Sequence, residues 1–180
     1  MRLKLNRFLP RFPKWARDSS PRLFVSPEVM DFIRQRSIVS PAQETGGILM
    51  GFHEGRDIRV VKASDAGPNA RRSSCGFLRD TAFCQSALNE EYARSGADYV
   101  GEWHTHVINL RRPSEGDLAT LIGLVVDTDY SFPSFSMILV VVHQGSAEIL
   151  GYMATAAAKT DRTLSVTVSG VTIEAAQPSH

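Results

Sequence analysis

The sequence is poor in cysteine, has almost no net charge and contains no long apolar run. Its two cysteines, Cys75 and Cys84, lack the C-x-x-C spacing of metal and redox motifs. No apolar run approaches the ~20 residues that a membrane-spanning helix needs. No continuous apolar segment of a secretory signal is visible either. We therefore expect reduced thiols and a cytoplasmic location.

The formal net charge of +1 gives no general electrostatic reason to expect nucleic acid or an acidic substrate. At 180 residues, 43% hydrophobic and 22% charged, the chain has the size and composition of one ordinary globular domain with a real core. We place this domain at residues 21–176, with a short tail at 177–180.

The first 20 residues differ from the rest in composition. They carry six basic side chains against one acid, interspersed with large apolar residues, and two prolines interrupt any long helix. This pattern is typical of a basic arm that is loose or lies along the domain. The alternative is a docking arm for an acidic partner or a membrane surface.

Apolar periodicity, caps and turn residues divide the domain into helices and strands. Helices are expected from Pro27 to about residue 36, from the cap Asp80 to residue 95, and from the cap Ser114 onward. Strands are expected at 23–25, 44–52, 58–63, 98–105, 137–143, 148–154 and 163–169, with 171–175 as a candidate hairpin partner of the last. Residues 64–79 are expected to form a loop. This order predicts an α+β (or α/β-like) fold in which helices cover the faces of a mixed sheet.

The most distinctive segment of the sequence is GEWHTHVINLRRPSEGD. If residues 98–105 form a strand, His104 and His106 point to the same face. A carboxylate from Asp117, on the next element, would complete a set of three ligands, which is the number that a catalytic zinc takes from protein. Taken alone, an H-x-H pair is more often a surface or hydrogen-bonded pair. Ser114 to Asp117 also fits an ordinary capping box before an apolar helix.

A separate acidic residue, Glu44, precedes two glycines and an apolar strand. A metal hydrolase needs a general base close to the metal but not bound to it, and Glu44 is the candidate. The alternative for Glu44 is a surface carboxylate beside a turn. Gly46 and Gly47 permit close approach of another backbone, which makes them candidate substrate-binding positions.

Glu44, the His104-x-His106 pair, Ser114 and Asp117 together resemble the signature of the JAMM (JAB1/MPN+/Mov34) zinc metalloproteases. The segments ETGGILMG, which begins at Glu44, and GEWH resemble the prokaryotic JAB branch of that family. The likeness covers roughly residues 23–153. It implies an α-β-α sandwich of the cytidine-deaminase-like type. RadC-type proteins share a related H-x-H…S-x-x-D pattern, so the motif alone does not identify the substrate.

The resemblance also implies roles for these residues. One catalytic Zn²⁺ would be held by His104, His106 and Asp117. Glu44 would take a proton from the attacking water and pass it to the leaving amine. Ser114 would stabilise the oxyanion.

Two residues flank the histidine pair in sequence. Glu102 and Trp103 are expected on the face opposite His104, or at its edge. Trp103 is expected in the core.

Members of the JAMM family commonly cleave the amide bond after the extended C-terminal tail of ubiquitin or a ubiquitin-like protein. The stretch at residues 66–80 resembles members that remove conjugates from the C-terminus of a cGAS-like nucleotidyltransferase in the antiviral CBASS system. This implies a protein substrate with an extended tail and a functional link to E1- and E2-like enzymes. We expect such a tail to add as a strand beside residues 64–79, near Arg71 and Arg72. No nucleic acid partner is expected.

Three alternatives stay open at this point. The same site would serve a peptidase that trims a sulfur-carrier protein or a biosynthetic intermediate. A non-catalytic MPN-type interaction module is the second, although such modules usually lack one or more ligands and this chain has all three. The third is a RadC-like protein linked to DNA repair, against which the near-neutral charge and the lack of an obvious basic recognition helix argue.

Overall fold

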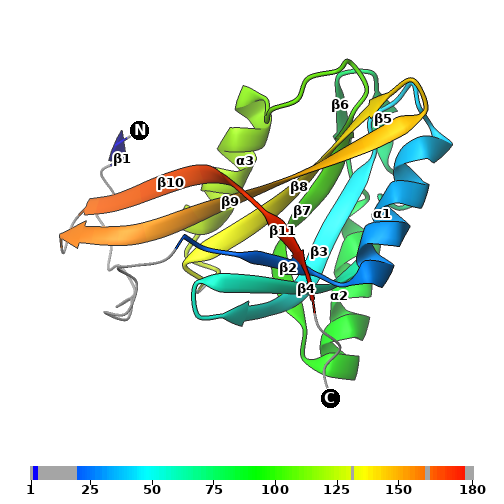
Figure 1. Cartoon of the computed structure of the whole chain (residues 1–180). Helices are drawn as coiled ribbons and strands as arrows, with labels where there is room; N and C mark the ends of the chain where they lie inside the picture. Colours follow the sequence, from blue (N-terminus) through cyan, green and yellow to red (C-terminus); the bar gives the residue numbers. More distant parts are fainter. Residues whose placement is uncertain (1, 4–19, 131, 161–162, 177–180) are drawn as a thin grey trace.

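The fold is a mixed sheet covered by helices on both faces, as seen in a computed structural model of the chain (Figure 1). The structure describes residues 2–3, 20–130, 132–160 and 163–176. Most of the basic arm expected at 1–20, and the tail at 177–180, lie outside these described residues. Among the helices of the described residues, none has the length and apolar character that crossing a membrane requires.

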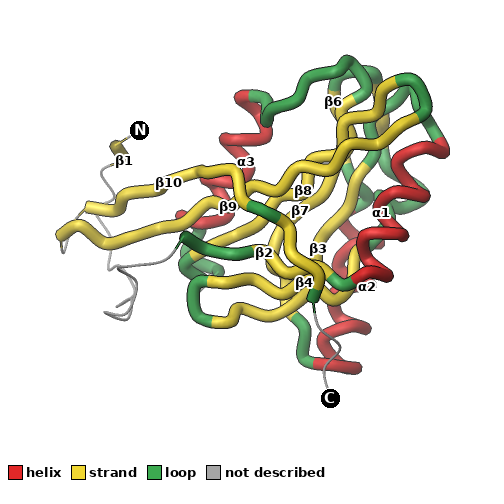
Figure 2. Tube along the Cα trace, in the orientation of Figure 1, coloured by secondary structure: helices red, strands yellow, loops and turns green. Residues whose placement is uncertain are grey.

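Within the described residues the main sheet has nine strands, in the order β1-β10-β9-β8-β7-β3-β4-β2-β11 (Figure 2). Their bounds are β1 Arg2–Leu3, β2 Leu23–Val25, β3 Gly46–Glu54, β4 Asp57–Ala63, β7 Asp98–His106, β8 Ser134–His143, β9 Ser146–Thr160, β10 Thr163–Val171 and β11 Ile173–Ala175. The pairs β7–β8, β2–β4 and β11–β2 are parallel, and the other pairs are antiparallel. Strand β7 lies in the middle of this order, so both of its edges are hydrogen-bonded. The predicted mixed α+β fold is confirmed.

In the described part of the chain three helices cover the sheet: α1 (Pro27–Val39) on one face, and α2 (Thr81–Ser95) and α3 (Glu115–Val126) on the other. Each begins at the cap that the sequence predicted. The side chains of Ser26, Asp80 and Ser114 accept hydrogen bonds from backbone N–H groups of the first turn. Helix α2 ends at Gly96, whose φ of 74° is the left-handed conformation that glycine adopts without strain.

Two predictions about chain segments were wrong. Residues 64–79 are not only a loop, because β5 (Arg71–Ser73) and β6 (Gly76–Leu78) form a short antiparallel hairpin. Strand β11 does not pair with β10. The whole length of β10 is already paired with β9, and β11 lies parallel to β2.

The imidazole of His53, at the end of β3, is buried against aromatic rings. It stacks on Phe132, with ring centroids 4.1 Å apart, and the edge of Phe135 lies 6.2 Å away. Within the described residues neither ring nitrogen has a hydrogen-bond partner. Burial lowers the pKa of His53 to about 4, and the nearby Asp98 only partly opposes this.

His53 should therefore destabilise the fold in acid. Its pKa is lower in the folded state (about 4) than in the unfolded chain (about 6.5), so the unfolded chain binds the proton more tightly. The cost is absent above about pH 6.5, grows as pH falls, and levels off below about pH 4 at on the order of 3 kcal/mol. His53→Phe should remove this part of the pH dependence in urea unfolding at pH 7.5 and 4.5. His143→Phe, at an exposed position, is the control; identical pH slopes for both variants would contradict the assignment.

Candidate active site

Strand β7 presents its side chains alternately to the two faces of the sheet. Trp103 is fully buried on the α1 side, where its ring meets the edge of Phe32 at 6.3 Å, and its predicted place in the core is confirmed. His104 and His106 face the other side, toward α3. The prediction for Glu102 was wrong. Residues two apart on a strand share a face, and Glu102 lines the same cavity as His104.

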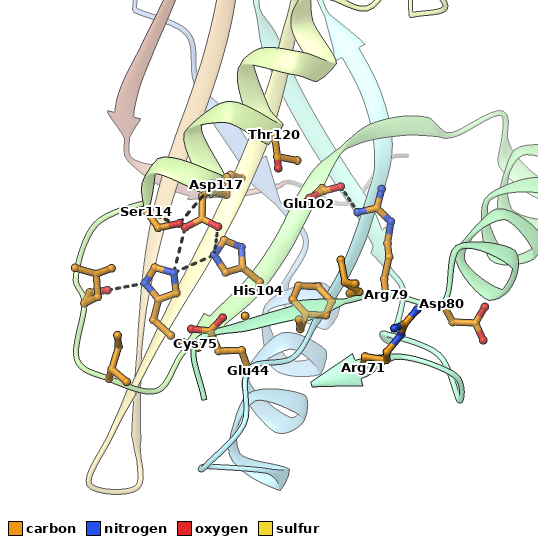
Figure 3. Close-up of a pocket in the computed structure, with 18 of the residues that line it drawn as sticks. Glu44, Arg71, Cys75, Arg79, Asp80, Glu102, His104, Ser114, Asp117 and Thr120 are labelled. Atoms are coloured by element: carbon orange, nitrogen blue, oxygen red, sulfur yellow. Dashed lines mark hydrogen bonds and ion pairs between the residues drawn. The ribbon is translucent and has the colours of Figure 1, made fainter. Parts of the chain in front are cut away.

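His104, His106 and Asp117 form a compact triad at the start of α3 (Figure 3). The Nε2 atoms of the two histidines lie 3.2 Å apart. Asp117 Oδ1 lies 3.2 Å from His104 Nε2, and Asp117 Oδ2 lies 3.2 Å from His106 Nε2. The three residues predicted as ligands from the sequence are therefore brought together by the fold.

The chemistry of these atoms fits a cation. His106 Nδ1 lies 2.8 Å from the carbonyl oxygen of Leu110, and a carbonyl only accepts, so Nδ1 carries the proton. A neutral His106 then presents a lone pair on Nε2 to the Asp117 carboxylate. Two acceptors 3.2 Å apart need a proton or a metal ion between them. Zinc bonds of about 2.0–2.1 Å at tetrahedral angles place ligand atoms about 3.3 Å apart, close to the spacing in the triad.

Asp117 serves the helix and the triad at once. Its Oδ2 accepts the backbone N–H of Ser114 at 2.7 Å, and its own N–H donates to Ser114 Oγ at 3.2 Å, which completes a capping box. Burial alone would raise the pKa of Asp117, but its contacts with His104 and His106 and the N–H of Ser114 hold it well below its usual range. The capping and ligand interpretations of the Ser114–Asp117 motif are thus compatible, because the two carboxylate oxygens have room for both partners.

Glu44 is buried, with 6% of its surface exposed, and lines the same cavity as the triad (Figure 3). Its backbone N–H donates to the carbonyl of Ser73 in the β5–β6 hairpin at 2.7 Å. Burial raises the pKa of Glu44, and the charges of His106 and His104 partly oppose the rise. A carboxyl with a raised pKa takes and returns a proton near neutral pH more readily than an ordinary glutamate does.

The cavity that joins these groups has a volume of about 800 Å³. Ser114 and Asp117 of α3 lie at one end. Phe77 of β6 and Ile108, in the loop after β7, also line it. The ring of Phe77 lies nearly parallel to that of His104, with centroids 6.5 Å apart, so the hairpin covers one ligand of the triad from the side.

The family model of prokaryotic homologues of the JAB domain matches residues 27–155, a span that holds the triad, Ser114 and Glu44. The chain belongs to this family. The resemblance predicted from the sequence is confirmed.

Three bacterial relatives of this JAB domain bear the name CD-NTase/cGAS isopeptidase. The protein from Escherichia coli (strain TW11681) is 28% identical over 109 residues, covering 59% of this chain and 70% of the relative. That from Vibrio cholerae serotype O1 is 36% identical over 76 residues, covering 41% and 49%. That from Enterobacter hormaechei subsp. hoffmannii is 24% identical over 110 residues, covering 60% and 61%. The matches thus span between about half and 70% of the lengths of these relatives.

Two solution structures share the fold of the JAB domain described above. A protein from Desulfitobacterium hafniense aligns with a TM-score of 0.57 at 17% identity, covering 86% of this chain and 94% of that one. A protein from Salinibacter ruber aligns with a TM-score of 0.51 at 22% identity, covering 86% and 92%. At these identities the likeness establishes the fold alone.

Gly46 and Gly47, which follow Thr45, pack closely against other parts of the protein. A Cβ on Gly46 would lie 2.2 Å from the carbonyl oxygen of Trp103 and 2.6 Å from the Phe77 ring. A Cβ on Gly47 would lie 2.2 Å from the carbonyl oxygen of Ser64. The close approach that the glycines allow is therefore to neighbouring protein backbone, which accounts for both positions without a substrate.

The two arginines of β5 point to different surroundings. Arg71 lines the active-site cavity. Arg72 instead donates from Nε to Thr45 Oγ1 at 3.3 Å and from Nη2 to the carbonyl of Gly67 at 3.5 Å. The Arg72 guanidinium is thus hydrogen-bonded within the protein, and one of its partners is Thr45, the residue that follows Glu44.

Thr105, between the two histidines, holds the segment that carries Glu44, a role that the sequence did not indicate. It is fully buried, its Oγ1 accepts the N–H of Thr45 at 2.9 Å, and its own N–H donates to the carbonyl of Thr45 at 2.8 Å. Two hydrogen bonds between Thr105 and Thr45 therefore connect β7, which carries the two histidines, to the segment that carries Glu44.

We expect Thr105→Val to lower kcat roughly tenfold with little change in KM or metal content, because small shifts of a catalytic group are costly. Loss of the buried acceptor should also cost about 1–3 kcal/mol in the free energy of unfolding. Thr105→Ser retains the oxygen and should restore kcat. Steady-state kinetics and urea unfolding measure the two effects. An unchanged kcat in a destabilised Thr105→Val protein would show that the contact is structural only.

Proposed function

We propose that this chain is a zinc-dependent isopeptidase. It hydrolyses the amide bond after the C-terminal tail of a ubiquitin-like or cGAS-like protein conjugate, within a bacterial antiviral defence system. The observation that carries the proposal is the His104–His106–Asp117 triad facing Glu44 in one cavity. The names of the three bacterial relatives support the substrate class.

The residues of the site would have separate roles in such a hydrolysis. His104, His106 and Asp117 would hold the metal, and zinc in a three-ligand site lowers the pKa of a coordinated water and polarises a carbonyl. Glu44 accepts the proton of the attacking water and passes it to the nitrogen of the leaving amine. Its burial raises the pKa of the carboxyl, which makes Glu44 a better acceptor for the first transfer, and the carboxylic acid that results is still a donor for the second.

Ser114 would support the oxyanion that forms on the scissile carbonyl. Its Oγ accepts the N–H of Asp117, which leaves the hydroxyl proton available for a second partner. A hydroxyl that lines the cavity beside the ligand carboxylate donates to charge that develops in the transition state.

The β5–β6 hairpin is the proposed dock for the extended tail. Within the described residues β5 and β6 pair as strands only with each other, so each keeps an outer edge that no other strand covers, although Ser73 of β5 already bonds to the Glu44 backbone. Such an edge accepts an extended peptide through backbone hydrogen bonds. The carbonyl of Ser73, which holds the Glu44 backbone, connects this hairpin directly to the proposed base.

The test is cleavage of a fusion whose junction carries the C-terminal tail of a ubiquitin-like or cGAS-like protein. We expect cleavage at the end of the tail with zinc-loaded protein, loss of cleavage with a chelator, and recovery when zinc is added back. Mass spectrometry of the products locates the scissile bond. Zinc-loaded protein that cleaves neither tail would exclude this substrate class while leaving the metal site in place.

A further inference from the structure

The active-site cavity has a second polar end. Arg71 of β5, Arg79 just after β6 and Asp80 at the start of α2 line it, across the cavity from Ser114 and Asp117 (Figure 3). The hydrolysis step itself gives this end no function, although Arg71 belongs to the hairpin that we propose as the dock for the tail. The metal triad, the base and the oxyanion donor all lie elsewhere in the cavity.

The carboxylates at this end already have donors. Asp80 Oδ1 accepts the N–H of Phe83 at 3.2 Å, and Oδ2 accepts the backbone and side-chain N–H groups of Asn69 at 3.2 and 2.8 Å. Glu102 accepts from Arg79 Nη1 and from the hydroxyl of Tyr99, the latter at 2.8 Å. Both carboxylates therefore have donors within the protein, although the two bonds to Glu102 go to Oε1 and leave its Oε2 without a partner among the described residues.

The arginines differ from the carboxylates in this respect. Within the described residues, the Arg71 guanidinium has no hydrogen-bond or ion-pair partner, and Arg79 engages only its Nη1. The formal charges of Arg71, Arg79, Asp80 and Glu102 sum to zero, so the imbalance lies in hydrogen bonding. The open N–H donors of Arg71 and Arg79 outnumber the one open carboxylate oxygen, Glu102 Oε2, so the ligand that suits this end is an acceptor.

We propose that Arg71 and Arg79 form a subsite for a carboxylate of the protein substrate, on an acidic side chain or a chain terminus close to the scissile amide. A guanidinium stays charged and presents a planar fork of N–H groups that matches a carboxylate. Arg79 is partly buried, which strengthens such a contact, whereas Arg71 is exposed and keeps more of its water. This inference rests on the proposed function, and it pairs Arg71 with Arg79 rather than with Arg72, whose guanidinium is held by Thr45 and Gly67.

The first test is binding, which does not depend on cleavage. The Nε–Hε signals of Arg71 and Arg79 in the ¹⁵N-labelled full chain are followed by NMR during titration with short peptides. The probes are Ac-Ala-Glu-Ala-NH₂, Ac-Ala-Gln-Ala-NH₂, and Ac-Ala-Ala-Ala with a free C-terminal carboxylate. We expect both signals to shift with the Glu peptide or the free terminus, and the stronger of the two identifies the source of the carboxylate. Equal shifts with the Gln peptide, or shifts confined to His104 and His106, would overturn the proposal.

Variants test whether peptide binding depends on Arg71 and Arg79. Arg71→Gln should weaken binding of the carboxylate peptide roughly tenfold, as expected for loss of a charge-assisted contact. Arg34→Gln, on α1 and outside the cavity, should leave binding unchanged. Because Arg79→Gln alone would leave Glu102 with only Tyr99 as a donor, the double variant Arg79→Gln/Glu102→Gln keeps this pair neutral. Unaltered binding in both Arg71→Gln and the double variant would refute the subsite.

A cleavage assay distinguishes failure of the proposed subsite from failure of the proposed function. Fusions that carry Glu or Gln at single positions flanking the scissile amide should differ roughly tenfold in kcat/KM at one position. Arg71→Gln should bring that ratio close to one. Protein that binds the Glu peptide but cleaves no fusion supports the subsite and refutes the isopeptidase. Protein that cleaves Glu and Gln fusions equally and binds neither peptide supports the isopeptidase and refutes the subsite.

Discussion

Replacing Asp117 by asparagine is expected to abolish cleavage through loss of the metal while leaving the fold in place. Asparagine keeps an oxygen that can accept the N–H of Ser114, so the capping box that starts α3 loses little. It removes the negative charge that faces His104 and His106. Changes to groups that only support metal ligands cost about 10–100-fold in affinity, so loss of a charged ligand should cost more than about 100-fold.

Competition with a chromophoric chelator measures the expected loss of zinc affinity. Urea unfolding of the metal-free proteins measures whether the fold is kept. The unfolding free energies of wild type and Asp117→Asn should agree to within about 1 kcal/mol. Glu115→Gln is the matched control, since it removes an exposed carboxylate in the same helical turn. Full zinc occupancy in Asp117→Asn would mean that the third ligand is another residue.

The parts of the site that the sequence predicted are those whose signals are local. The alternation of β7 places His104 and His106 on one face, and the Ser114–Asp117 spacing marks a helix start by the same two bonds that the structure contains. The buried strand β8 was equally visible, because a strand covered on both faces reads as a continuous apolar run. In each case a few neighbouring residues determine the structure, so no knowledge of distant contacts is needed.

The parts that were missed have different causes. Strands β5 and β6 are three residues each, which is too short for a period-two pattern to be read from the sequence. The link from Thr105 to Thr45 joins residues 60 apart in the chain. The placement of Glu102 is a different case. The alternation rule applies to it directly, and the expected face was assigned wrongly.

Glu44→Gln should lower kcat by about 10²–10⁴-fold with zinc content unchanged, because an amide cannot take the proton that a general base must carry. Glutamine matches the shape of glutamate, and the backbone bond to Ser73 does not involve the side chain, so the local structure should persist. Single-turnover cleavage, with the zinc stoichiometry measured, distinguishes this result from the loss of metal expected for Asp117→Asn. The control is Glu90→Gln, at an exposed position on α2. Cleavage at the wild-type rate would move the base to another group in the cavity. A slow variant with full zinc should hold an uncleaved substrate, which makes it the reagent for capturing the natural conjugate.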